Sequence, residues 1–285
     1  MRRLLGVLLA LGLAVPVIAD GTVVCSATSH SGIGFSETTL SASAGLQCDR
    51  PAAGGGAPSS LLDGLVSYWK LDEASGTRED TPGSNDLTDN NTVGSAAGIL
   101  GNAASFVAAN SEYLSHTDNA PLSTGDIDFT FACWVNLNNN NTRMTLVGKD
   151  VAGGREYELN FNSTRFEFDV FNGVDTQLGQ VANNNLGLPS TGTWYFLVVW
   201  HDATANTVNI AANAGTANVA ATSGAVGDGN ATFNLGRRSY AGNESYLDGF
   251  LDEVGFWKRV LTTAERACLY GGGTPPAYPF TGVCN

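Results

Sequence analysis

The chain has 285 residues, and its 27 Asp and Glu residues against 14 Lys and Arg residues give a formal net charge of −13. A surface with this charge repels nucleic acid and anionic lipid, so we exclude nucleic acid as a partner. The same charge suits divalent cations, basic partners or simple solubility outside the cell.

The chain begins with the pattern of a secretory signal peptide over residues 1–19. Arg2 and Arg3 form its basic start, residues 4–15 form its apolar stretch, and residues 17–19 are a small-residue cleavage site. The apolar stretch is shorter than the roughly 20 residues that cross a bilayer, and an uncleaved anchor is the alternative. We therefore expect a secreted protein, outside the cell, at its surface or in the periplasm, with no membrane insertion after signal removal.

Five cysteines in an exported chain predict two disulfides and one free thiol. Cys25 and Cys48 flank one N-terminal segment, and Cys268 and Cys284 flank the C-terminal tail, so proximity in the sequence favours these two pairs. Each bridge would stabilise the fold by about 3 kcal/mol. Cys133 lies among apolar residues of an expected strand, which is typical of a buried free thiol.

Composition divides the rest of the chain into three parts. Residues 20–60 contain a segment rich in Ser, Thr and Gly with two cysteines, and they end in a Gly, Pro and Ser linker. Residues 61–273 are long enough for one large β-sandwich. Residues 274–285 form a short tail that the expected disulfide tethers.

Short runs of alternating apolar and polar residues predict antiparallel strands in the large domain. The clearest runs are residues 129–135, the pair 156–161 and 166–170, and residues 194–200. The last run is apolar on both faces, which predicts a central strand that is covered on both sides. This pattern indicates an all-β fold, an antiparallel jelly-roll β-sandwich.

One short helix is expected after the last strand. Thr262 offers a hydroxyl as N-cap and Glu265 lies three residues later, which is the pattern of a capping box. Ala264 and Cys268 recur at helical spacing, and the glycines at 271–273 end the helix. A single C-terminal helix should therefore close the strand-rich chain.

Four sequence motifs carry a resemblance to a known family. They are the opening run 64–77, the strands 129–135 and 192–199, and the closing strand and helix 249–270. In this order they resemble the laminin-G-like, concanavalin-A-like jelly-roll domains of many secreted proteins. The resemblance implies the β-sandwich fold but not a ligand, because this architecture hosts binding modules, adhesins and enzymes alike.

Glycoside hydrolases of the laminarinase type share this fold and place a Glu-x-Asp-x-x-Glu signature on one strand, so that alternate carboxylates face the substrate. The corresponding positions here are Glu167, Asp169 and Asn172. Asn172 replaces the last carboxylate and cannot transfer a proton. The sequence also lacks a Gly-x-Ser-x-Gly motif. We therefore expect no enzyme, and glycoside hydrolysis is the least favoured alternative.

Four carboxylates of one expected hairpin, Glu156, Glu158, Glu167 and Asp169, should project from one side of two neighbouring strands. Paired carboxylates at cross-strand distance repel each other, and a Ca²⁺ ion or a basic ligand between them would relieve that repulsion. These residues are therefore candidates for a ligand surface. A solvated face neutralised by flanking arginines is the alternative.

Calcium is the cofactor that the resemblance implies, because domains of this family often hold it with oxygen ligands near the loop after the first strand. In that loop Asp80 and Asn85 match the family pattern, while Ser84 and Leu87 depart from it. Asp252, on the closing strand, is the other acidic position and would reach the same loop. These three residues are the expected Ca²⁺ ligands, and a hydrogen-bonding role that pins the loop is the alternative.

Aromatic side chains raise the question of sugar stacking, since rings provide flat apolar faces beside a polar edge. The five tryptophans lie within apolar strand patterns, which favours core packing. Trp134 alternates with Phe131 and Cys133, and it is the tryptophan that we retain as a ligand-surface candidate. Tyr240 and Tyr246, in a Gly-rich loop region, are the candidates for a rim contact.

The sequence therefore predicts a secreted, non-catalytic binding or adhesion module that recognises a glycan, a surface polymer or an extracellular protein. Specificity should lie in the loops at the edge of the sandwich. The alternative is a structural subunit of an extracellular filament, a surface layer or a virion, in which self-assembly would use residues 20–50.

Overall fold

The structure is a computed structural model, and it describes residues 17–18, 22–27, 46–49, 60–240 and 242–280. The predicted linker and Cys284 lie outside these residues, as does nearly all of the predicted signal peptide. The chain divides into two units, Met1–Gly56 and Ala57–Asn285.

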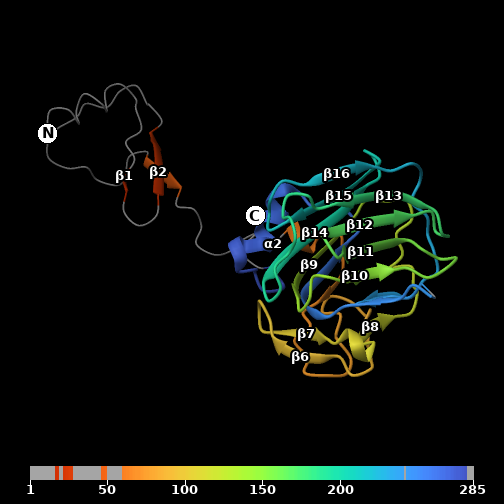
Figure 1. Cartoon of the computed structure of the whole chain (residues 1–285). Coiled ribbons are helices and arrows are strands. Elements are labelled where there is room, and N and C mark those ends of the chain that lie inside the picture. Colours follow the sequence, from red (N-terminus) through yellow and green to blue (C-terminus); the bar gives the residue numbers. More distant parts are fainter. Residues whose placement is uncertain (1–16, 19–21, 28–45, 50–59, 241, 281–285) are drawn as a thin grey trace, which may run out of the picture. The chain divides into compact units, whose positions relative to one another are not determined.

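In the N-terminal unit, three strands form one antiparallel sheet in the order β1-β2-β3 (Figure 1). They are β1 (Val17–Ile18), β2 (Thr22–Ala27) and β3 (Leu46–Asp49). The register of β2 and β3 places Cys25 opposite Cys48. This register agrees with the expected bridge between them, which stays a prediction.

The C-terminal unit is a sandwich of two antiparallel sheets, as Figure 1 shows. The seven-stranded sheet has the order β13 (Gln177–Ala182), β12 (Phe166–Phe171), β11 (Tyr157–Asn162), β10 (Arg143–Lys149), β17 (Phe233–Leu235), β8 (Tyr113–His116) and β5 (Thr88–Asn90). The eight-stranded sheet has the order β16 (Asn218–Ala221), β15 (Thr207–Ala212), β14 (Trp194–Asp202), β9 (Phe129–Leu137), β20 (Gly249–Trp257), β7 (Asn102–Phe106) and β6 (Gly94–Ala97), with β4 (Leu65–Trp69) paired to β20.

Short elements complete this unit. A two-stranded ribbon consists of β18 (Arg237–Arg238) and β19 (Ser245–Tyr246). The helices are η1 (Ser60–Leu62), η2 (Ala108–Asn110), α2 (Thr263–Tyr270) and η3 (Gly271–Gly273). The predicted antiparallel sandwich with one short C-terminal helix is confirmed. In the described part of the chain, no helix is both long enough and apolar enough to cross a membrane.

The main core lies between the two sheets, because alternate residues of each strand point inward. Phe131 of β9 stacks on Phe256 of β20 with ring centroids 4.3 Å apart, and it meets Tyr157 of β11 at 4.9 Å. Cys133 is buried in the same cluster as a free cysteine, and burial raises the pKa of its thiol to about 12. Aromatic packing from both sheets thus holds the sandwich together.

The helix α2 begins at the expected capping box. Glu265 N–H donates to the Thr262 hydroxyl at 3.2 Å, and the Glu265 carboxylate accepts from Thr262 N–H at 2.8 Å. Arg259 adds two hydrogen bonds to the same carboxylate, at 2.7 and 2.8 Å. The helix ends at Gly271, whose φ of 55° is left-handed.

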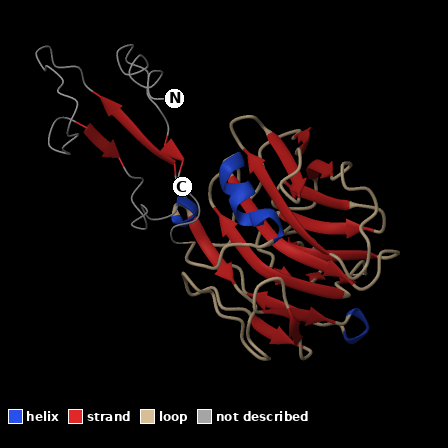
Figure 2. Ribbon diagram, turned by 90° about the vertical axis from the view of Figure 1, so that its left-hand side faces the viewer, coloured by secondary structure: helices blue, strands red, loops and turns tan. Residues whose placement is uncertain are grey.

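A second apolar cluster lies on the outer face of the eight-stranded sheet, which α2 covers (Figure 2). Trp134 is buried there, stacked on Tyr270 with ring centroids 5.8 Å apart. Its ring is therefore packed beneath the helix, and it does not form the exposed ligand surface that we expected of it. Cys268 of α2 is disulfide-bonded, and the expected pairing with Cys284 stays a prediction.

Candidate functional site

An open cavity of about 510 Å³ lies at one edge of the seven-stranded sheet. Strands β8, β10 and β12 end at this edge and β17 begins there, because neighbouring strands run antiparallel. The loops that follow or precede these strands therefore meet. They supply the lining residues Asp118, Ala120, Ser123, Gly153, Gly173, Asp228, Gly229 and Asn230.

Glycines allow these loops to pack backbone against backbone. Gly227 N–H donates to the Phe171 carbonyl at 2.9 Å, and a Cβ on Gly227 would lie only 2.0 Å from the carbonyl of Asn172. A Cβ on Gly229 would lie 2.2 Å from the carbonyl oxygen of Gly154. Side chains at these two glycines would force the loops apart. The residues between and beside them are consequently held at the cavity.

Two polar side chains of this loop make no hydrogen bond or ion pair with the described residues, although the Asp228 charge raises the pKa of Lys258 against the effect of burial. Asp228 and Asn230 are both exposed and both line the cavity. Within residues 60–240 and 242–280, no hydrogen bond or ion pair engages the Asp228 carboxylate, and no hydrogen bond engages the Asn230 amide. A free carboxylate and a free amide together offer both donors and acceptors to a ligand.

Asp118, the third polar residue considered at the cavity, belongs to a buried ion-pair network. The Lys149 side chain is fully buried, and its Nζ donates to Asp118 at 2.6 Å and to Ser123 at 2.9 Å. Lys149 also pairs with Glu156, which accepts two hydrogen bonds from Thr124 at 2.9 and 3.1 Å. Burial raises the pKa of Glu156, while Lys149 lowers it. This network fixes the orientation of Asp118.

The other carboxylates of the predicted acidic hairpin lie elsewhere, on the outer face of β11 and β12. The register places Glu158 directly opposite Asp169, and Asn160 opposite Glu167. Glu156 does not join them, because it turns to Lys149 at the sheet edge. The four carboxylates therefore do not form one surface.

Each carboxylate on this outer face has its own protein partners. Glu158 is buried and accepts from Arg143 and from the Thr145 hydroxyl, both at 2.6 Å. Asp169 accepts from Asn160 at 2.9 Å and from Gln177 at 2.7 Å. These partners satisfy the charges that we expected a cation or a basic ligand to satisfy.

Burial has the largest effect on the pKa values of the carboxyl groups on this outer face. It raises the pKa of Asp169 to about 6 and also raises the pKa of Glu158, against the effect of Arg143. Glu167 is half-buried, and its carboxylate accepts from Asn162 at 2.5 Å. Asn172 does not face this surface as a substitute acid, because its side chain accepts the N–H groups of the turn that follows, at 3.0 and 3.1 Å.

The two candidate tyrosines lie on or beside the ribbon of β18 and β19. Tyr240 packs between two guanidinium groups, 5.2 Å from Arg155 and 5.0 Å from Arg238. Tyr246 lies 5.8 Å from the guanidinium of Arg237. Both rings are half-buried, and cation–π contacts fix them to the protein.

The expected calcium ligands form two separate hydrogen-bond sites. Asp80 accepts from Tyr68 N–H at 3.0 Å, from the Ser67 hydroxyl at 3.1 Å and from Asn85 N–H at 3.0 Å. The Asn85 side-chain oxygen accepts from Asn119 at 2.7 Å. This network pins the loop to β4, as the alternative interpretation stated.

Asp252 makes its hydrogen bonds to a different turn. Its Oδ2 accepts the N–H groups of Ile99 at 2.7 Å and Leu100 at 3.2 Å, and burial raises its pKa to about 7. Among the described residues, no group of three or more His, Cys, Asp or Glu side chains is placed to hold a metal ion. Hydrogen-bond donors occupy both Asp80 oxygens and Asp252 Oδ2, whereas the buried Asp252 Oδ1 has no hydrogen-bond partner. Calcium binding by these residues stays a prediction.

The sequence of the sandwich identifies the family of this chain. A family model described as the concanavalin A-like lectin/glucanases superfamily matches residues 108–265, more than half of the chain. The chain belongs to this superfamily. The match to this lectin/glucanase superfamily confirms the resemblance carried by the four motifs. No curated protein sequence matches the chain.

Solved structures with a similar fold include toxin binding domains and one domain of an arabinanase. The binding domain of Paraclostridial Mosquitocidal Protein 1 has a TM-score of 0.60 and 14% identity, over 74% of this chain and 52% of that one. The botulinum neurotoxin serotype C1 binding domain has a TM-score of 0.58 and 9% identity, over 76% of this chain and 53% of that one. The chain spans about half the length of these toxin domains. At such identities the likeness shows the fold alone.

A third structure matches over nearly its whole length. Domain 4 of AbnA, an extracellular arabinanase from Geobacillus stearothermophilus, solved in complex with arabinotriose, has a TM-score of 0.50 and 19% identity. The match covers 72% of this chain and 98% of that domain. The two folds therefore correspond in extent as well as in architecture.

Proposed function

We propose that this chain is a secreted, non-catalytic carbohydrate-binding module that holds a sugar unit in the cavity lined by Asp118, Asp228 and Asn230. The observation that carries the proposal is the pair Asp228 and Asn230, exposed at an open polar cavity and without a hydrogen bond or ion pair to the described residues. A sugar presents adjacent hydroxyls that both donate and accept. A carboxylate accepts such donors strongly, because one partner of each hydrogen bond is ionised.

The construction of the cavity supports a preformed site. Glycine packing sets the backbone position of Asp228, and the buried Lys149 sets the side-chain position of Asp118, so the loop backbone and one carboxylate are ordered before a ligand binds. The cavity is open and contacts few ligand atoms, which favours dissociation constants of about a micromolar to a millimolar. The solved structures with this fold include an arabinanase domain in complex with arabinotriose and toxin binding domains, which agrees with this function.

The state of the carboxylates in the described residues supports a function without catalysis. Glycoside hydrolysis needs one carboxyl that keeps a proton and a second that is free to attack or to activate water. Asp118 pairs with the Lys149 ammonium, and Glu158 and Asp169 are buried with protein partners. Of the two carboxylates that line the cavity, Asp228 is the one without an ion pair among the described residues.

The test is an array of soluble oligosaccharides, arabinotriose included, followed by calorimetry with the ligands retained. The matched pair of variants is Asp228→Asn and Glu244→Gln, since each removes one negative charge and Glu244 is exposed on another loop. We expect Asp228→Asn to weaken binding about tenfold, as loss of a charge-assisted hydrogen bond does. Equal affinities of the two variants would refute the site, and release of shorter sugars from the bound ligand would refute the non-catalytic function.

A further inference from the structure

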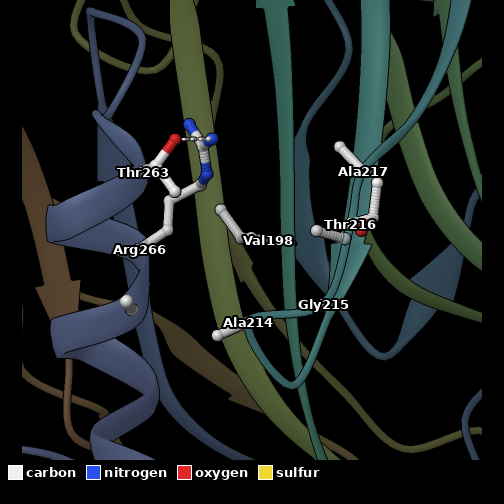
Figure 3. Close-up of a pocket in the computed structure, with 9 residues that line it drawn as sticks. Val198, Ala214, Gly215, Thr216, Ala217, Thr263 and Arg266 are labelled. Carbon is white, nitrogen blue, oxygen red and sulfur yellow. Dashed lines mark hydrogen bonds between the residues drawn. The ribbon is translucent and has the colours of Figure 1, made fainter.

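A second cavity, of about 250 Å³, lies between α2 and the outer face of the eight-stranded sheet (Figure 3). It shares no lining residue with the sugar cavity. Figure 3 shows Thr263 and Arg266 of α2 on one side, Val198 of β14 between, and the turn from Ala214 to Ala217 on the other side. Ala211 and Ala267 complete the lining.

The body of this cavity is apolar. Val198 and Ala211 form its floor from neighbouring strands, and the small side chains of Ala214, Ala217 and Ala267 leave the space above them unfilled. An apolar cavity of about 150 Å³ is known to bind a benzene-sized molecule. The volume here suffices for a short aliphatic chain or a single ring.

One charged side chain, that of Arg266, lines this apolar cavity. The Arg266 guanidinium lies 4.1 Å from the centre of the Trp200 ring, and it donates to the Leu261 carbonyl and, at 3.1 Å, to the Thr263 hydroxyl. A guanidinium has five N–H donors, so these two bonds to neutral acceptors leave donors available. Stacking on the ring fixes its orientation.

The charge of Arg266 is only partly compensated. Burial lowers the pKa of Arg266, and the neighbouring Glu265 opposes that effect from a carboxylate that Arg259 engages. No carboxylate among the described residues lies within ion-pair distance of Arg266. A partly desolvated cation of this kind is stabilised when an anion with matching planar geometry joins it.

We propose that this cavity binds a small monocarboxylate of about six carbons, the size that the cavity volume permits. The carboxylate accepts from Arg266, and the Thr263 hydroxyl, which already accepts from Arg266, donates its proton to the second carboxylate oxygen. The apolar body lies on Val198 and Ala211. Charge complementarity selects the acid over neutral molecules of the same shape.

The test is a titration of the full chain, followed by backbone-amide NMR, with hexanoate and with hexanamide as its neutral isostere. We expect hexanoate to shift residues of α2 and of the 211–217 segment, and to bind at least tenfold more tightly than hexanamide. Arg266→Gln should remove this preference, Arg266→Lys should keep part of it, and Ala217→Leu should fill the cavity and abolish binding of both. Equal binding of the two probes, or an unchanged preference in Arg266→Gln, would overturn the proposal.

A titration with peptides tests whether the cavity instead binds the C-terminal carboxylate of a peptide chain. A tripeptide that ends in leucine is titrated with a free and with an amidated C-terminus. Binding of the free-acid peptide without binding of hexanoate would assign the cavity to a chain terminus and overturn the small-ligand assignment. Lack of binding by any probe up to about 10 mM would overturn the site as a whole. Neither result bears on sugar binding at Asp228.

Discussion

Replacing Glu253 by Gln should flatten the dependence of stability on pH. Glu253 lies at a bulge of β20, is 4% exposed, and accepts a hydrogen bond from the Tyr68 hydroxyl. Burial raises the pKa of Glu253 to about 8; the Tyr68 hydrogen bond lowers it, and the neighbouring Asp252 raises it. Gln keeps the shape and the hydrogen-bond acceptor but carries no charge.

The sign follows from the two pKa values. The folded chain holds a proton on Glu253 up to about pH 8, whereas the unfolded chain releases it near the ordinary value of 4.5. Stability from this group is therefore fully present below pH 4.5 and is lost as the pH rises through 8. The gap between the two values corresponds to about 5 kcal/mol of unfolding free energy.

The assay is urea unfolding at a series of pH values from about 4 to 9, with the unfolding free energy extrapolated to water. Between the acidic and the alkaline end of this range, the unfolding free energy of Glu253→Gln should fall by about 3 to 5 kcal/mol less than that of the unsubstituted chain. At the acidic end, the two unfolding free energies should agree within about 1 kcal/mol. Glu244→Gln is the control, and it should leave the slope unchanged. A slope in Glu253→Gln as steep as in the unsubstituted chain would refute the reasoning.

Further expectations follow from the cavity and the core. Gly229→Ala should push its loop away from Gly154 and weaken sugar binding at least tenfold. Circular dichroism should show that the secondary structure is intact. An unchanged affinity for the sugar would contradict the backbone packing. Lys149→Met should leave Glu156 buried without its cation and lower the unfolding free energy at neutral pH by about 3 to 5 kcal/mol, and a loss below about 1 kcal/mol would contradict the burial. Cys133 should react with a thiol reagent only on unfolding, so rapid labelling of the native chain would show that the strand is open.

Local patterns predicted the fold well. The capping box of α2 was visible because both of its residues, Thr262 and Glu265, lie within one turn of the chain. The alternation in residues 129–135 and 166–170 likewise depends on neighbours along a strand. Such patterns do not depend on distant contacts, so they suffice to predict the sandwich and its closing helix.

The outer faces of the strands were harder to interpret. Trp134 alternates with core residues and so points away from the sandwich, but α2 follows more than a hundred residues later and covers it. Glu158 and Asp169 do share a face as expected, yet Arg143 and Gln177 arrive from neighbouring strands to pair with them. Alternation gives the face of a residue but not what covers that face.

The candidate site was missed because its residues come from separate loops. Asp118 and Asp228 lie in loops before β9 and before β17, and only the antiparallel order of the sheet brings them together. The run Gly227-Asp228-Gly229-Asn230 was the available signal, since paired glycines around a polar residue favour close backbone approach. Its partner loops are not visible from that run alone.

The central claim is that Asp228 and its cavity bind sugar, and calorimetric titration of the tightest oligosaccharide from the array tests it most directly. The unsubstituted chain and Glu244→Gln should give the same dissociation constant, between about a micromolar and a millimolar. Asp228→Asn should give one about ten times larger. Equal constants for all three proteins, or the lack of any retained oligosaccharide, would contradict the account.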